Sequence, residues 1–259
     1  MSTSVVLIPG APALVPELSG AAFADSAAQV DTVCAMLREA ARTARRVLVV
    51  GTDEQRRTLP DVRSTLTRWG ADIPVGSEGA PAASHGSVPD TALIGWWMLD
   101  RAGIELPRTF TGVDERGLGH DCRPAGDDAG NAPVEGVGVA AGDLVVVVVA
   151  DGPASLTPRA PIPEDPRGVA LDAELAAWLR GGGDLPDPGP DTADGVGWWS
   201  RAAWLTLGGL VRGRAAQEAV SWSPFGVGYH GARWESVPLG GPAGSGDGAS
   251  HGYSHGGPA

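Results

Sequence analysis

Two aspartates stand directly after predicted buried strands, where their side chains could do chemistry. Asp53 lies just beyond RVLVV at residues 46–50, and Asp151 follows LVVVVVA at residues 144–150. Open α/β sheets keep their ligand sites at the carboxyl ends of the strands, so both carboxylates could face one pocket as ligands or acid–base groups. Alternatively, each carboxylate caps a turn by accepting backbone N–H groups. An unpaired charge beside a buried strand is costly, so we expect Asp151 to have a partner.

Histidine and cysteine offer fewer candidates. His230 lies in the run GVGYHG, where strand alternation places it opposite Tyr229. It could enter a pocket or face solvent as an ordinary strand residue. The sequence has no zinc-type cysteine spacing, and we expect Cys34 to be a small buried side chain. His251 and His255 fall in a Gly-rich tail, where we expect at most adventitious metal binding.

Alternating strands and helices must position these side chains. A strand at 5–8 leads into a loop punctuated by Pro9, Gly10, Pro12 and Pro16. The hydrophobic periodicity then predicts helices at 26–43, 91–102, 166–180 and 197–210, further strands at 46–50, 108–112 and 144–150, and a closing strand pair at 220–222 and 227–234. The segment 52–70 is ambiguous, and 184–194 is predicted to be a loop.

This order predicts an α/β protein built as a three-layer α/β/α sandwich with a mostly parallel central sheet. The run LVVVVVA has no polar alternation, so both faces of that strand should be covered by helices. We expect one domain over residues 1–237 and a disordered Gly/Ser/His-rich tail over 238–259.

Composition excludes several classes of partner. The formal charge is −12, and all 19 basic residues are Arg. An acidic chain without a basic cluster is repelled by phosphate backbones and anionic membranes, so we expect no nucleic-acid partner and no membrane association. The sequence shows no signal-peptide pattern and no apolar run near ~18 residues, which predicts a cytoplasmic protein.

Other common catalytic patterns are missing from the sequence. It contains no G-x-S-x-G elbow, no phosphate-binding G-x-x-x-x-G-K-[ST] loop and no G-x-G-x-x-G after the first strand. The tryptophan pairs at 96–97 and 198–199 could form a stacking platform for an aromatic ligand, although core packing of amphipathic helices explains them more simply.

Three segments together resemble one family. They are IPGAPALVPEL at 8–18, ADGPASLTPRAPIPEDPRGVALDAELAAWL at 150–179, and SPFGVGYHGARW at 223–234. In this order and spacing they look like the class III extradiol ring-cleavage dioxygenases of the LigB type, in particular a compact actinobacterial branch. The resemblance implies an α/β/α domain that holds non-haem Fe(II) with two histidines and a carboxylate, plus an acid–base histidine.

The family's functional residues do not carry over to this sequence. The first-loop histidine falls on Gly10, the second near Thr52 and Asp53, and the acid–base histidine at about Ala154. For the carboxylate, Glu218 is the nearest candidate, or Trp222 occupies the position. Glycine and alanine have no donor to replace an imidazole ligand of iron.

Two hypotheses follow from this comparison. In the first, the protein is a homologue that has lost its Fe(II) histidines and binds a small aromatic ligand or a protein partner, with no cofactor. Its pocket candidates are Gly10, Asp53, Asp151, Ala154 and His230. In the second, it is an active Fe(II)-dependent extradiol dioxygenase or a derived oxidoreductase that uses replacement residues. Either form could be a homo-oligomer.

Overall fold

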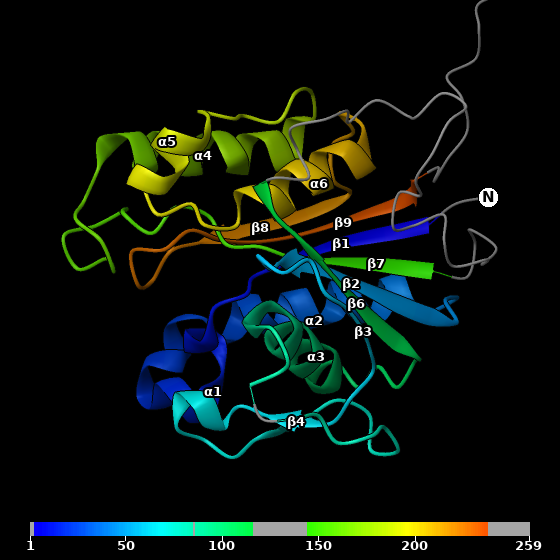
Figure 1. The fold of residues 1–259 in the computed structure, drawn as a ribbon. Coiled ribbons are helices and arrows are strands. Elements are labelled where there is room, and N and C mark those ends of the chain that lie inside the picture. Colours follow the sequence, from blue (N-terminus) through cyan, green and yellow to red (C-terminus); the bar gives the residue numbers. More distant parts are fainter. Residues whose placement is uncertain (1–2, 85, 116–143, 238–259) are drawn as a thin grey trace, which may run out of the picture.

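A mixed sheet of seven strands runs through the middle of the molecule, in the order β3-β6-β2-β7-β1-β9-β8 (Figure 1). The computed structural model describes residues 3–84, 86–115 and 144–237. The four strands at the centre are parallel, and they are β6 (Arg108–Val113), β2 (Arg46–Thr52), β7 (Leu144–Val149) and β1 (Thr3–Ile8). Antiparallel strands complete the edges, with β3 (Thr58–Pro60) on one side and β9 (Tyr229–Val237) and β8 (Glu218–Trp222) on the other.

Helices cover both faces of this sheet, which confirms the predicted α/β class and the three layers. On one face lie α2 (Ala27–Ala41) and α3 (Asp90–Arg101), with the short α1 (Pro16–Ser19) beyond them (Figure 1). On the other lie α4 (Pro166–Gly181), α5 (Pro190–Gly195) and α6 (Arg201–Val211). A two-stranded sheet of β4 (Ser64–Thr65) and β5 (Pro74–Val75) stands outside the layers.

Strand alternation divides the core into two apolar clusters. In β7, Val145, Val147 and Val149 belong to the cluster beneath α2 and α3. Val146 and Val148 belong to the cluster beneath α4 and α6. All five valines are at most 1% exposed, and each contributes ~1.5–3 kcal/mol by its burial. The uninterrupted valine run is therefore the centre of the sheet, as its sequence predicts.

Several boundaries differ from the sequence predictions. The segment 52–70, left ambiguous, contains β3, β4 and a 3-10 turn at Thr67–Trp69. The predicted loop at 184–194 contains most of α5, and the predicted helix at 197–210 begins only at Arg201. Asp165 caps α4, because its carboxylate accepts the N–H of Arg167 at 2.8 Å. The predicted tail, 238–259, lies outside the described residues.

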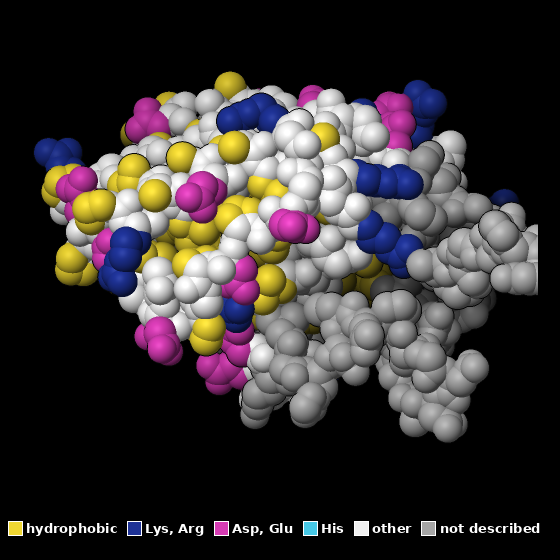
Figure 2. All heavy atoms as spheres, turned by 90° about the horizontal axis from the view of Figure 1, so that it is seen from above, with side chains coloured by type: hydrophobic (Ala, Val, Ile, Leu, Met, Phe, Trp, Pro, Cys, Tyr) yellow, Lys and Arg dark blue, Asp and Glu magenta, His cyan; other side chains and the backbone are white. Residues whose placement is uncertain are grey.

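Two further expectations can be compared with the structure. Cys34 is buried, 2% exposed, as predicted. Within the described residues, no helix is long and apolar enough to cross a membrane. Figure 2 looks down on the layer of α4, α5 and α6, where acidic and basic side chains lie scattered among apolar ones.

Candidate functional site

The loop after β1 and the turn after β7 meet at the carboxyl edge of the sheet. The Asp151 carboxylate accepts the backbone N–H of Gly10 at 2.9 Å and also that of Ala11. Burial raises the pKa of Asp151 to about 7, although these two N–H donors act to lower it. The partner expected for Asp151 is thus a pair of backbone groups, in the turn-capping role.

No room for an imidazole exists at Gly10. A Cβ at this position would lie 2.9 Å from Cγ1 of Val149 and 3.6 Å from Oδ2 of Asp151. The nearby Tyr229 has its pKa raised, mainly by burial and further by the Asp151 carboxylate. The Val149 and Asp151 side chains therefore occupy the space next to Gly10, where the resemblance would place the side chain of the first-loop histidine.

Asp53 also takes the capping role. Its carboxylate accepts the Arg57 backbone N–H at 2.8 Å and two guanidinium N–H groups, at 2.7 and 3.0 Å. Burial alone would raise the pKa of Asp53, but the Arg57 side-chain and backbone donors outweigh it, so the pKa lies below the usual range. A carboxylate held in this bidentate ion pair is not placed to bind a ligand.

His230 is buried, which contradicts the solvent-facing alternative. Its ring is 0% exposed and packs edge-on against Trp204, with ring centroids 5.4 Å apart. Nδ1 lies 2.9 Å from Oγ of Ser221 in β8, and Nε2 lies 3.0 Å from Oδ1 of Asp172 in α4. Tyr229 packs against Trp222 and Phe225 on the opposite face, as alternation predicts.

Ser221, His230 and Asp172 are the residue types of a nucleophile–base–carboxylate triad. None of the three lines the large cavity described below. The Asp172 carboxylate packs closely against the backbone of Gly228, where an added Cβ would lie 1.9 Å from its Oδ1. We assign the chain of hydrogen bonds a structural role, which ties β8 and β9 to α4.

The remaining predicted positions do not join a common site. Ala154 is 2% exposed and donates its N–H to the Val196 carbonyl at 3.1 Å. Glu218 is exposed at the start of β8 and faces Arg233 at 3.8 Å. Trp222 donates its indole N–H to Ser26 Oγ at 3.1 Å. The structure brings together Gly10 and Asp151, and His230 Nε2 lies 3.0 Å from where a Cβ of Gly152 would be, while Asp53 is held by Arg57.

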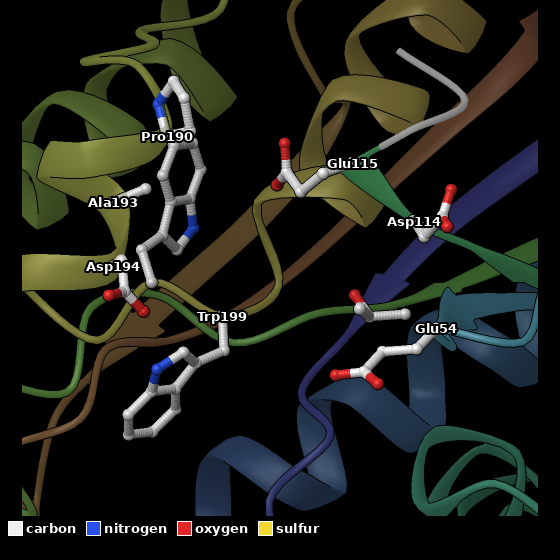
Figure 3. A pocket seen from close by; sticks show the side chains of 9 residues that line it. Glu54, Asp114, Glu115, Pro190, Ala193, Asp194 and Trp199 are labelled. Atoms are coloured by element: carbon white, nitrogen blue, oxygen red, sulfur yellow. The ribbon is translucent and has the colours of Figure 1, made fainter. Parts of the chain in front are cut away.

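A cavity of about 740 Å³ opens at the carboxyl ends of β2 and β6 (Figure 3). This size is usual for small-molecule sites. Figure 3 shows Asp194 and Trp199 on one side, and Glu54, Asp114 and Glu115 on the other. The described residues that line it are Thr52, Glu54, Asp114, Glu115, Pro190, Ala193, Asp194, Trp198 and Trp199.

Two lining residues carry buried polar atoms without a hydrogen-bond partner in the described part of the chain. They are the indole Nε1 of Trp198, a residue 1% exposed, and Oγ1 of Thr52. Leaving such a group unpaired costs ~1–3 kcal/mol. Both residues line the cavity, and each holds a buried polar group that the described part of the chain leaves unsatisfied.

Sequence reasoning found Thr52 and the tryptophan pair but not this arrangement. Trp96 and Trp97 are buried beneath the opposite face of the sheet from Trp198, so the proposed four-tryptophan platform is wrong. Trp199 stands apart from the other three, because it is 58% exposed at the cavity. The acidic residues of the cavity had no recognisable motif in the sequence.

The arrangement does not fit a 2-His-1-carboxylate iron centre. The positions at which the resemblance would place the two ligand histidines are Gly10 and the Thr52–Asp53 pair, and the position for the acid–base histidine is Ala154, so none of them supplies an imidazole. Among the described residues, no group of three His, Cys, Asp or Glu side chains could hold a metal ion. Comparison of the sequence with protein-family models and with curated proteins gives no match.

Proposed function

We propose that this protein is a divergent homologue of the LigB-type extradiol dioxygenases that binds a small ligand without iron. The order of the three resembling segments supports the ancestry, and the seven-stranded α/β sheet is compatible with it. The ligand site is the 740 Å³ cavity at the carboxyl ends of β2 and β6, which is where α/β proteins bind their ligands.

The cavity's unsatisfied polar lining is the observation that carries this proposal. Trp198 and Thr52 line the cavity, and their buried Nε1 and Oγ1 atoms have no hydrogen-bond partner in the described residues. The positions that would hold iron are instead used for packing and capping, since Val149 crowds Gly10 and Arg57 binds Asp53. The scaffold thus keeps a ligand cavity and lacks the iron donors.

Iron content tests the loss of the metal site. Untagged full-length chain with His251→Ala and His255→Ala, which removes the tail histidines, is loaded anaerobically with Fe(II) and desalted. We expect iron far below one per chain and no ring-opened product from catechol. About one iron per chain, as a single non-haem centre requires, with catechol cleavage would overturn the proposal in favour of an active dioxygenase.

A fragment screen tests the cavity. Thermal shifts are measured on the full chain, on Trp199→Ala, and on the control Val169→Ala, which truncates the other exposed large apolar side chain of residues 3–84, 86–115 and 144–237. We expect fragments that raise the melting temperature of the parent and of the Val169 variant, but not of the Trp199 variant. Hits that are insensitive to Trp199, or a screen without hits, would contradict a ligand site in this cavity.

A further inference from the structure

The described residues that line the cavity carry charge of one sign. Four of its nine described residues are carboxylates, namely Glu54, Asp114, Glu115 and Asp194, and none of the nine is basic. Arg56 approaches Asp114 at 3.7 Å, and Arg201 pairs with Glu115, but neither arginine lines the cavity. The chain as a whole carries −12, so the potential in this cavity attracts cations.

An aromatic face is exposed beside these carboxylates. Trp199 is 58% exposed, whereas the neighbouring Trp198 is 1% exposed. It lies on the same side of the cavity as Asp194, across from Glu54 (Figure 3). An organic cation gains from an indole face through cation–π attraction and from carboxylates through charge, so the two features select the same chemical group.

A buried donor in the wall of the cavity adds a second criterion. Trp198 lines the cavity, and its buried Nε1, which is a donor only, has no acceptor among the described residues. An acceptor oxygen or nitrogen on the ligand would satisfy this donor. Thr52 Oγ1, also unpartnered there, can bond to the same polar group.

We infer that the cavity binds a small organic cation, an ammonium or guanidinium compound that also carries a hydrogen-bond acceptor. The cationic group lies against Trp199 and the carboxylates, and the acceptor reaches the Trp198 indole. This inference rests on the proposed ligand-binding function and names its ligand class. A bare metal ion fits less well, because no three potential ligands among the described residues are close enough to share one.

Calorimetric titration with matched probes tests this inference. Choline carries a quaternary ammonium and a hydroxyl, and 3,3-dimethylbutan-1-ol is its neutral isostere. Agmatine serves as the guanidinium probe and benzoate as the anion. We expect choline or agmatine to bind one per chain, and the neutral isostere and benzoate at least about tenfold more weakly. Trp199→Ala and Asp194→Asn should each weaken cation binding by about three- to tenfold, and Val169→Ala should leave it unchanged.

The outcomes separate the inference from the proposed function. Binding of the isostere or benzoate as tight as that of the cations, with dependence on Trp199, would overturn the cationic ligand class and leave a ligand cavity. If no probe binds and no fragment in the thermal screen depends on Trp199, both the cationic ligand class and the proposed ligand-binding function are refuted. Cation binding that survives Trp199→Ala unchanged would also overturn the inference, because the cation then binds elsewhere.

Discussion

Replacing Asp151 with Asn should remove a pH dependence from the stability of the protein. The carboxyl is half-buried at the ends of β1 and β7, and its burial raises its pKa to about 7, from 3.8. Between these values the unfolded chain releases the proton while the folded chain retains it. Stability therefore falls as the pH rises from about 4 to about 7 and is level above that.

The size of the effect follows from the two pKa values. The difference between the unfolded and folded pKa values, 3.8 and about 7, corresponds to about 4 kcal/mol in the free energy of unfolding, at about 1.4 kcal/mol per pH unit. Because water still reaches part of the carboxyl, screening reduces this to about 2–4 kcal/mol. The variant's free energy of unfolding should therefore rise relative to the parent by this amount between pH 4 and pH 8.

Urea unfolding followed by circular dichroism measures this difference at each pH. Asp53→Asn is the matched control, because the pKa of Asp53 is lowered and its carboxylate is ionised in both states above pH 5. The difference between the free energies of unfolding of Asp53→Asn and the parent should be constant between pH 5 and pH 8. Parallel stability curves for the parent and Asp151→Asn would refute the assigned environment of Asp151.

Three further predictions concern packing, each measured by urea unfolding. Gly10→His should lower the free energy of unfolding by about 1–3 kcal/mol, since side chains already occupy the space beside this residue. The variant should still hold no stoichiometric iron, and a stable variant that binds Fe(II) would contradict this. Gly228→Ala should destabilise strongly because its Cβ would lie 1.9 Å from Asp172, whereas Gly209→Ala, with open space, should stabilise by about 0.5–1 kcal/mol; the reverse order would show that the packing is misassigned. Asp172→Ala should cost about 1–3 kcal/mol by leaving His230 Nε2 without its partner, and an unchanged stability would rule out the proposed role of this pair.

Local patterns were sufficient to predict the layers of the fold. The valine run of β7 is buried on both faces, and the apolar stripe from Val30 to Leu37 faces the sheet from α2. These features follow from residue periodicity, which needs no knowledge of distant contacts. The turn-capping alternatives for Asp53 and Asp151 were also open to sequence reasoning, because a short acidic side chain after a strand satisfies nearby backbone donors.

The candidate site could not be predicted in the same way, since it depends on contacts between distant segments. His230 is buried because Asp172, 58 residues away, meets its Nε2. Trp198 and Trp199 are adjacent in sequence and precede α6, which begins at Arg201, yet one is buried and the other exposed. Carboxylates after β2 and β6 and from α5 have no common spacing in the sequence, and only the folded sheet brings them together.

The indole N–H signals of the tryptophans test the central claim most directly. Proton–nitrogen correlation spectra of the full chain, with the cavity signals assigned by Trp198→Phe and Trp199→Phe, are recorded during a choline titration. The chain has nine tryptophans, and those beneath the opposite sheet face, such as Trp96, provide an internal control. We predict that the Trp198 and Trp199 signals shift in a saturable way while the Trp96 signal stays in place. A saturating titration that leaves both cavity signals unmoved would contradict the account.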